Sequence, residues 1–370
     1  MRGLAKILIV LVVALMLLGA IIVFTASGTY SVTKFNSLYF LFKAHLWKVL
    51  AALICLVVFA HVPYDLYRQH SKKLLFGIIG VLILTLMFAP KVKGAARWID
   101  LGFMQFQPSE AAKLILIMHI AVMIERQGEL LHDFKNGFIY TLIWIGIISG
   151  LVILQPNVST SLIIAITGFA VLYAGGARLK HIMLTFISAG GLAGMVTMLF
   201  KHSRERVLTF IESLVSGGDI NIQVRQAKIA LGSGGMFGVG LGHSRQSDLF
   251  LPESYGDFIF SILGEEIGFI GAVGVLFLYL ALFVICLVIA KKAHDKFGQL
   301  LVFGLGFNIL VSAFINAGVV TGLLPTTGIT LPFISFGGTS IILFGVSAGI
   351  IVNVARQTLK TEELRIAQVG

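Results

Sequence analysis

Ten long apolar runs, separated by shorter polar segments, make up most of the chain. They cover residues 6–26, 44–62, 73–89, 108–125, 137–155, 158–175, 180–200, 266–290, 297–319 and 333–355. Each run is close to the ~20 residues that an α-helix needs to cross the hydrocarbon of a bilayer. The pattern predicts an all-α polytopic membrane protein with ten transmembrane helices in one integral-membrane domain, residues 1–370. The first run is longer than the roughly 7–15 apolar residues of a signal peptide, so we interpret it as a retained helix.

Composition agrees with this interpretation. Hydrophobic residues make up 57% of the chain and charged residues 12%, and the mean hydropathy is +0.97. A soluble domain carries about 25% charged residues, so a large soluble protein is excluded. The formal net charge of +11 fits basic loops that face anionic lipid. We therefore expect no nucleic-acid partner.

The distribution of Lys and Arg predicts the orientation. With the N-terminus inside, the inner segments hold fifteen Lys and Arg residues and the short outer loops hold six. Because cytoplasmic loops carry the excess of positive charge, both termini are predicted to be cytoplasmic. The long loop of residues 201–257, between the seventh and eighth helices, is then extracytoplasmic.

One short outer segment departs from this rule. Lys91, Lys93 and Arg97 place three cations outside within seven residues. A solvated hairpin, whose side is fixed by its neighbouring helices, is one interpretation. The other is an anion site, because clustered Lys and Arg side chains are the natural partners of phosphate.

The fourth run begins with Gln-Pro-Ser-Glu and carries two charges inside its apolar sequence. Glu110 and Lys113 are three residues apart, so they share one helix face and can pair. Ionisable groups in a membrane helix are costly and usually mark a site or a pathway. A structural ion pair between helices is the alternative interpretation.

The long outer loop has its own helical pattern. Residues 204–215 place apolar side chains at helical spacing on one face, which predicts a helix that either lies in the membrane interface or packs on the rest of the loop. The glycine-rich segment 232–242 matches neither GxGxxG nor GxxxxGK[ST]. We interpret it as a mobile or tightly turning backbone near the membrane surface, not as a nucleotide site.

Asp257 stands where this loop meets the next apolar run. The sequence then stays apolar for over thirty residues, interrupted only by Glu265 and Glu266, which is too long for one straight span. We expect residues 257–266 to form a partial helix that keeps all three carboxylates near the outer water boundary. Residues 321–340 are uncharged with two prolines, and such backbone at membrane depth must lie against protein or a wet cavity.

These residues permit two kinds of chemistry. No Cys/His cluster offers a zinc site and there is no DxD motif for a metal-dependent transferase. A carboxylate at the boundary of water and hydrocarbon can act as a general base, and nearby cations can stabilise a departing pyrophosphate. The residues alone leave open an enzyme that acts on a phosphorylated lipid at the outer face and a transporter with a polar central pathway.

Several motifs resemble those of a known family, and this resemblance favours the enzyme over the transporter. They are Lys93-Gly-Ala-Ala-Arg-Trp-Ile-Asp-Leu-Gly102, Phe106-Gln-Pro-Ser-Glu-Ala-Ala-Lys113, Gln155-Pro156, Ala227-Lys-Ile-Ala-Leu-Gly-Ser-Gly-Gly235, Leu251-Pro-Glu, Asp257-Phe-Ile-Phe, Gly264-Glu-Glu-Ile-Gly268 and Leu331-Pro-Phe-Ile-Ser-Phe-Gly-Gly338. In this order they resemble the motifs of the SEDS family, the shape, elongation, division and sporulation proteins that include FtsW, RodA and SpoVE. The resemblance covers nearly the whole chain.

The resemblance implies a ten-helix glycosyltransferase of the plasma membrane that polymerises lipid II into peptidoglycan glycan strands at the outer face. It implies a class B penicillin-binding protein as partner, together with other membrane proteins of the divisome. Asp257 matches the family's essential aspartate, with a role as general base. The substrate- or pyrophosphate-binding residues implied in the same way are Lys93, Arg97, Glu110, Lys113 and Arg206. A divalent cation, Mg²⁺ or Mn²⁺, is an expectation at the level of the family, with no ligands assigned.

Residues 256–266 and 321–332 resemble the FtsW-like division branch more than the RodA-like elongation branch, which predicts a location at the division septum. Elongation remains the alternative. Asn157, Ser159 and Phe336 depart from the common pattern, and the first weakens a catalytic or metal role for the hairpin between the fifth and sixth helices. A lipid II flippase and a non-catalytic division scaffold also remain open.

Overall fold

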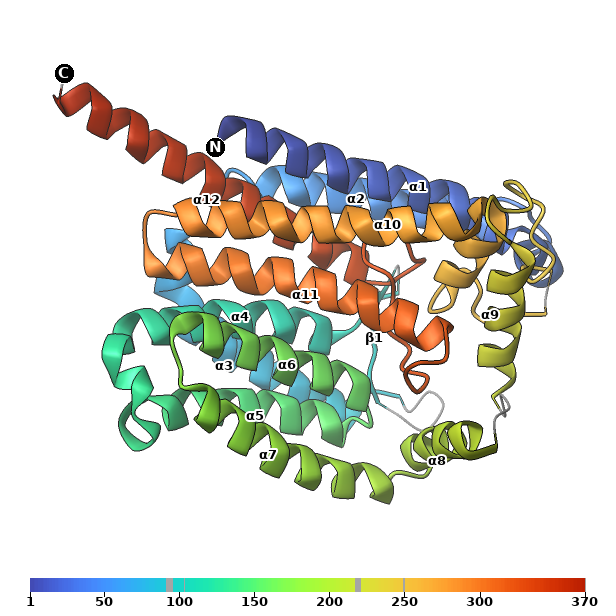
Figure 1. Ribbon diagram of the computed structural model, residues 1–370, viewed down its shortest axis with the longest axis horizontal. Coiled ribbons are helices and arrows are strands. Elements are labelled where there is room, and N and C mark those ends of the chain that lie inside the picture. The colour runs from blue at the N-terminus through green and yellow to red at the C-terminus, as the bar shows by residue number, and fades with distance from the viewer. Residues whose placement is uncertain (91–95, 103, 217–220, 249, 370) are drawn as a thin grey trace.

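The computed structural model describes residues 1–90, 96–102, 104–216, 221–248 and 250–369. Ten long helices in this part of the chain run back and forth along the long axis of the molecule (Figure 1). They are α1 (Arg2–Phe35), α2 (Phe40–Phe59), α3 (Asp65–Phe88), α4 (Pro108–Gln127), α5 (Ile139–Leu154), α6 (Val158–Gly175), α7 (Leu179–Leu199), α10 (Ile259–Lys292), α11 (Lys296–Val320) and α12 (Ser340–Val369). Each coincides with one of the ten apolar runs.

Length and composition mark nine helices in the described residues as able to cross a membrane. The remaining long helix, α4, carries Glu110, Lys113, Glu125 and Arg126. The prediction of an all-α polytopic membrane protein is confirmed. That α4 also crosses the membrane, and which side each end faces, stay predictions.

The helices differ in how deeply they are buried. In α11, 67% of the apolar window is buried inside the protein, compared with 12% in α7. Helix α4 packs against α3, α6 and α11 and therefore belongs to the centre of the bundle. The outward faces of α7 and its neighbours are apolar, as expected of helices that face lipid tails instead of water.

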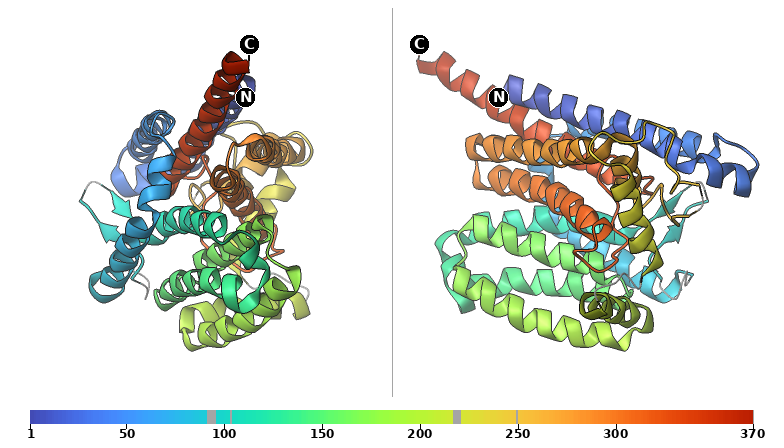
Figure 2. Two further views of the ribbon diagram at one scale, coloured as in Figure 1. Left: turned by 90° about the vertical axis from the view of Figure 1, so that its left-hand side faces the viewer. Right: turned by 45° about the vertical axis from the view of Figure 1, so that its right-hand side comes forward.

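Both termini and the two short helical turns η1 (Gly128–His132) and η2 (Phe134–Phe138) lie at one end of the bundle, and the remaining shorter elements lie at the other (Figure 1, Figure 2). At this second end are α8 (Lys201–Ser216), α9 (Ile222–Ser233) and a hairpin of β1 (Ile99–Asp100) and β2 (Gln105–Phe106). The shared end of the two termini agrees with their predicted common side. The helix expected at 204–215 is confirmed as α8, whose Leu208, Ile211 and Leu214 are exposed.

A charged cluster joins the helices at the end that holds the termini. Arg68 of α3 pairs with Asp295, which also accepts a hydrogen bond of 2.9 Å from the Tyr64 hydroxyl. The guanidinium Nε of Arg68 lies 3.5 Å from Glu125 of α4. The cluster therefore fixes α3, α4 and the turn before α11 relative to one another.

Helix α10 is broken at Gly268, whose φ of 73° and ψ of −177° are not helical. The break separates residues 259–267 from the longer segment that follows. This confirms the partial helix expected before the eighth span. The helix begins at Ile259, two residues later than the expected Asp257.

Candidate functional site

Asp257 lies directly before α10, and two buried side chains fix its backbone. The Asn316 amide of α11 donates to the Asp257 carbonyl oxygen at 2.8 Å and to the Ile329 carbonyl at 2.7 Å. The Ser335 hydroxyl donates to the Gly256 carbonyl at 2.8 Å. The uncharged segment 321–339 therefore holds the end of the long loop, as expected for irregular backbone against protein.

Arg97 and Arg206 both lie within electrostatic reach of Asp257, whose charge raises the pKa of each. Burial and, to a smaller extent, the Arg206 charge together lower the pKa of Arg97 to about 10, and the Asp257 charge opposes both effects. Burial also lowers the pKa of Arg206, and Asp257 again opposes the shift. The three charges act on one another although they come from three distant parts of the chain. The Arg97 guanidinium remains protonated near neutral pH because its pKa is lowered only to about 10.

Arg97 is positioned by the hairpin between α5 and α6. Its Nε donates to the Gln155 carbonyl at 3.4 Å, and its Nη2 donates to the Pro156 carbonyl. The fully buried Gln155 side chain donates in turn to the Leu82 carbonyl of α3 at 2.9 Å. Arg97 is therefore half-buried and bound to carbonyl oxygens, so its side chain is not freely solvated, and the anion site stays a prediction.

Arg206 reaches the site from α8. Its Nη1 donates to the Thr326 carbonyl at 3.2 Å, which connects α8 to the segment after α11. A small cleft beside it has hydroxyl and amide groups in its walls. The lining residues are Arg206, Thr209, Phe210, Ser213, Asn221, Val224, Gly322, Leu324, Pro325 and Thr326.

Glu110 and Lys113 form the ion pair that their spacing predicts, with 2.9 Å between Nζ and Oε1. Their side chains are 12% and 5% exposed, so the charges are almost removed from solvent. The Lys113 ammonium also lies 5.8 Å from the centre of the Phe344 ring on α12. The pair therefore joins α4 to α12, and its two interpretations, site and structural ion pair, are compatible.

A short chain of contacts connects this pair to Arg97. Asn157 follows the carbonyl that Arg97 binds, and its side chain donates to the Ser109 hydroxyl at 3.3 Å. Ser109 immediately precedes Glu110. Asn157 occupies the N-cap position of α6, but its side chain makes no capping hydrogen bond.

Lys93, the remaining cation assigned by resemblance, lies outside the described residues. Glu265 and Glu266 are described, and their side chains are buried inside the protein instead of facing water. They are 2% and 1% exposed. Glu265 accepts hydrogen bonds from the Ser233 hydroxyl at 3.1 Å and the Arg245 amide at 3.2 Å.

The break at Gly268 explains the glycine-rich segment. The broken helix leaves backbone groups of α10 unpaired, and the segment supplies their partners. The Glu265 and Glu266 carbonyls accept from the amides of Val239 and Gly240 at 3.0 and 3.1 Å. A Cβ added to Gly234 would lie 2.1 Å from the Gly264 carbonyl oxygen, so only glycine permits this approach. Of the two interpretations of segment 232–242, a mobile or a tightly turning backbone, the structure agrees with the second.

Asn316 and Ser335 are the positioning residues that the sequence analysis missed. Asn316 is 1% exposed in an otherwise apolar helix. A lone amide in a long apolar run is the signal that could have drawn attention to it, because a buried polar group needs partners.

A resident divalent cation does not fit the described side chains. Among the described residues, no three His, Cys, Asp or Glu side chains come together as a metal site. Within the described part of the chain, the Arg97 and Arg206 guanidinium groups act on Asp257, and their positive charge repels a metal ion.

The fold and this site define an all-α polytopic membrane protein with a carboxylate and two arginines at one end of its bundle. The model of the FtsW/RodA/SpoVE family, described as "Cell cycle protein", matches residues 5–360. The chain belongs to this family.

Similar proteins agree with this assignment. A protein named "Probable peptidoglycan glycosyltransferase FtsW" from Geobacter sp. (strain M18) is 35% identical over 360 residues, which is 96% of this chain and 97% of the relative. "Stage V sporulation protein E" from Bacillus subtilis (strain 168) is 34% identical over 358 residues, 94% of this chain and 96% of the relative.

Two solved structures share the fold. One, described as "Structural coordination of polymerization and crosslinking by a peptidoglycan synthase complex", has a TM-score of 0.77 and 24% identity over 95% of this chain and 97% of the other. The rod shape determining protein RodA of Thermus thermophilus has a TM-score of 0.70 and 24% identity over 95% of this chain and 96% of the other.

Proposed function

We propose that this protein is a membrane glycosyltransferase that polymerises lipid II into peptidoglycan strands during cell division, with Asp257 as its general base. The names of its relatives support the reaction class. The single observation that carries the assignment of the site is the electrostatic interaction of Asp257 with both Arg97 and Arg206.

Each group has a defined part in this proposal. The Asp257 carboxylate accepts the proton of the acceptor sugar hydroxyl as its oxygen attacks the anomeric carbon of the donor. The bond from that carbon to the pyrophosphate breaks, and undecaprenyl pyrophosphate leaves. Arg97 and Arg206 bind the pyrophosphate and stabilise the negative charge that develops on it.

The surrounding groups hold the site residues and the substrate in place and take no part in proton transfer. The Glu110–Lys113 pair follows Ser109, which accepts a hydrogen bond from the α5–α6 hairpin, and this hairpin binds the Arg97 side chain. The cleft beside Arg206 offers hydroxyl and amide groups of the kind that hydrogen-bond sugars. Lys93 belongs to the same proposal as a further pyrophosphate-binding cation.

The proposed partners follow from the family and from the structural neighbour. A glycan strand must be cross-linked after it is made, and the similar synthase complex couples polymerisation to crosslinking. We propose a class B penicillin-binding protein as the partner of this chain, with other divisome membrane proteins, at the septum of the plasma membrane.

The test is glycan synthesis from lipid II by the purified full chain, with and without a cognate penicillin-binding protein whose transpeptidation is blocked. Asp257→Asn keeps the size of the side chain but removes the base. The matched control is Asp248→Asn, an exposed position of the same loop whose oxygen accepts from the Thr29 hydroxyl at 2.6 Å. Polymer from wild type and Asp248→Asn but none from folded Asp257→Asn is the expected result.

Equal synthesis by Asp257→Asn would refute its role as base and direct attention to Glu110. If no folded sample made polymer while lipid II still crossed vesicle membranes, a transporter would replace the enzyme. If division in cells were intact with Asp257→Ala and lost only with surface changes, a scaffold would replace both.

A further inference from the structure

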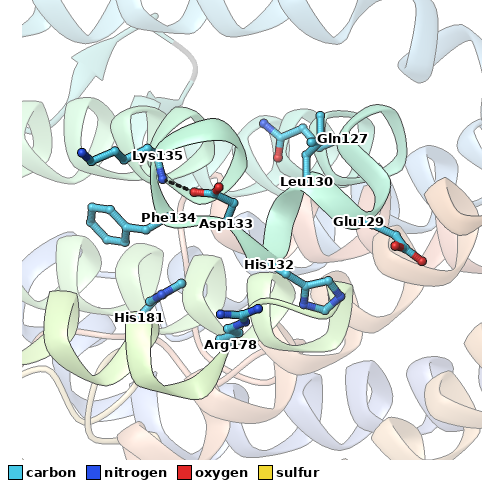
Figure 3. Close-up of a pocket in the computed structure, with 9 residues that line it drawn as sticks. All are labelled: Gln127, Glu129, Leu130, His132, Asp133, Phe134, Lys135, Arg178 and His181. Atoms are coloured by element: carbon cyan, nitrogen blue, oxygen red, sulfur yellow. Dashed lines mark hydrogen bonds between the residues drawn. The ribbon is translucent and has the colours of Figure 1, made fainter.

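A second polar cavity lies at the end of the bundle that holds the chain termini, opposite Asp257. Its volume is about 650 Å³, within the roughly 300–1,000 Å³ of small-molecule sites. It forms where α4 leads through two short turns into α5, and where α6 turns into α7 (Figure 3). Its lining residues are Gln127, Glu129, Leu130, His132, Asp133, Phe134, Lys135, Arg178 and His181.

The cavity presents both signs of charge. Arg178 and Lys135 are its basic side chains, and Glu129 and Asp133 are its carboxylates. Within the described residues, neither Arg178 nor Glu129 forms an ion pair. Figure 3 shows the Arg178 guanidinium extending toward His132 and Asp133, with Glu129 set apart on the opposite side. An exposed cation and an exposed carboxylate therefore stand on separate walls.

Asp133 has a local structural role that keeps it anionic. Its carboxylate accepts from the Lys135 amide at 2.8 Å and from the Asn136 side chain at 2.9 Å. These hydrogen bonds, with a smaller contribution from Arg178, lower the pKa of Asp133. The negative charge is therefore retained near Arg178, and it opposes the binding of a simple anion.

Two histidines complete the polar wall. The His181 ring packs edge-on against Phe134 with 5.3 Å between centroids. Its Nδ1 is buried and has no hydrogen-bond partner within the described residues. His132 lies beside Arg178 (Figure 3). An imidazole N–H is a suitable donor to a phosphate oxygen.

The residues around the cavity indicate that it lies at the level of the lipid headgroups. Tyr140 and Tyr173, 53% and 60% exposed, lie in the first turns of α5 and the last turns of α6, as aromatic belts do at membrane surfaces. From the cavity along α7, Leu184 and Ile187 are 62% and 67% exposed. A headgroup in the cavity would leave its acyl chains against such apolar side chains.

We propose that this cavity binds the headgroup of a zwitterionic phospholipid with a primary amine, as in phosphatidylethanolamine. Basic pockets between membrane helices bind lipid phosphate, and here Arg178 with the histidines receives it. The two carboxylates disfavour a purely anionic headgroup. Glu129, on the other wall, accepts hydrogen bonds from the ammonium group. The inference does not depend on the reaction at Asp257.

The test is lipid binding to the purified full chain, followed by native mass spectrometry and by thermal unfolding. The probes are phosphatidylethanolamine, phosphatidylglycerol and phosphatidylcholine with the same acyl chains. We expect phosphatidylethanolamine to bind most tightly and to raise Tm, because a ligand of the folded state stabilises it. Arg178→Gln weakens this binding about tenfold, the loss expected for one hydrogen bond to a charged group.

The matched control is Lys291→Gln, which removes one exposed cation from the same end but outside the cavity. It is expected to bind the lipid as wild type does. Glu129→Gln is expected to reduce the preference for phosphatidylethanolamine over phosphatidylglycerol while retaining the phosphate contact. Unchanged binding by folded Arg178→Gln, or equal losses in Arg178→Gln and Lys291→Gln, would overturn the proposal.

Soluble competitors distinguish a lipid site from a site for free phosphate. We expect O-phosphoethanolamine at millimolar concentration to displace the lipid, and inorganic phosphate to have little effect. Binding of inorganic phosphate that equals lipid binding and depends in the same way on Arg178 would assign the cavity to a free anion instead. A higher affinity for phosphatidylglycerol would overturn the role of the amine.

Discussion

Asn316 donates its side-chain amide to the backbone of Asp257 at 2.8 Å, across a sequence distance of 59 residues. The same nitrogen donates to the Ile329 carbonyl at 2.7 Å. One buried amide of α11 therefore sets the distance between the end of the long loop and the uncharged segment that lies against it.

Asn316→Leu should lower the rate of glycan synthesis at least tenfold while the protein still folds. Leucine has a similar volume but leaves two buried carbonyl oxygens without their donor, and each such loss costs about 1–3 kcal/mol. The measurement is polymer formed from lipid II, with thermal unfolding recorded in parallel. Asn308→Leu, at a buried amide of the same helix, is the control. A rate equal to that of Asn308→Leu would show that Asn316 does not position Asp257.

Lys113→Met alone should destabilise the protein by about 3–5 kcal/mol, because it leaves the Glu110 carboxylate buried and unpaired. The double variant Glu110→Gln, Lys113→Met should recover most of this loss. Thermal unfolding of both single variants and the double variant in detergent measures the coupling. Additive losses would mean that the 2.9 Å pair contributes nothing as a pair. Activity that stays low in the stable double variant would show a role beyond structure.

Gly238→Ala should destabilise the long loop strongly. Its φ is +85°, and an added Cβ would lie 2.2 Å from the Glu266 carbonyl oxygen. Gly232→Ala is the matched control, because it lies in α9 and an added Cβ meets nothing within 4 Å. Alanine is favoured over glycine in a helix by about 1 kcal/mol, so the two changes should shift Tm in opposite directions. Similar Tm values would contradict the packing of the glycine-rich segment on α10.

Arg97→Lys should make glycan synthesis sensitive to alkaline pH. Burial lowers the pKa of Arg97 only to about 10, so the wild-type cation persists through pH 9. Lysine begins from a lower pKa, about 10.4, and the same burial and the same Arg206 charge lower it further. The variant should therefore lose its charge and its activity as pH rises through a range in which wild type is unaffected.

The measurement for Arg97→Lys is the rate of synthesis between about pH 6.5 and 9.5, divided by the rate of wild type at each pH. Lys43→Arg, at an exposed cation on α2, serves to exclude general effects of exchanging the two basic residues. A constant ratio across the range would mean that the charge at position 97 is not required for catalysis.

The amino-acid sequence by itself determined the elements and the local pairs. Apolar runs of about 20 residues must be helices in a bilayer because no other segment can satisfy its own backbone there. The spacing of Glu110 and Lys113 fixed their pairing, and the periodic apolar positions of residues 204–215 fixed α8. These features depend on neighbours within one or two helical turns.

Only the tertiary structure decided which distant groups meet. The electrostatic interactions of Asp257 with Arg97 and Arg206 arise at one end of the bundle. This end brings together the β1–β2 region, α8 and the start of α10. From the sequence we expected Glu265 and Glu266 at the boundary of water and membrane. In the structure they lie just before the break at Gly268, and Glu265 accepts hydrogen bonds from an amide and a hydroxyl of the preceding loop region. Such contacts depend on how helices pack and where one breaks, and residue spacing along the chain does not encode them locally.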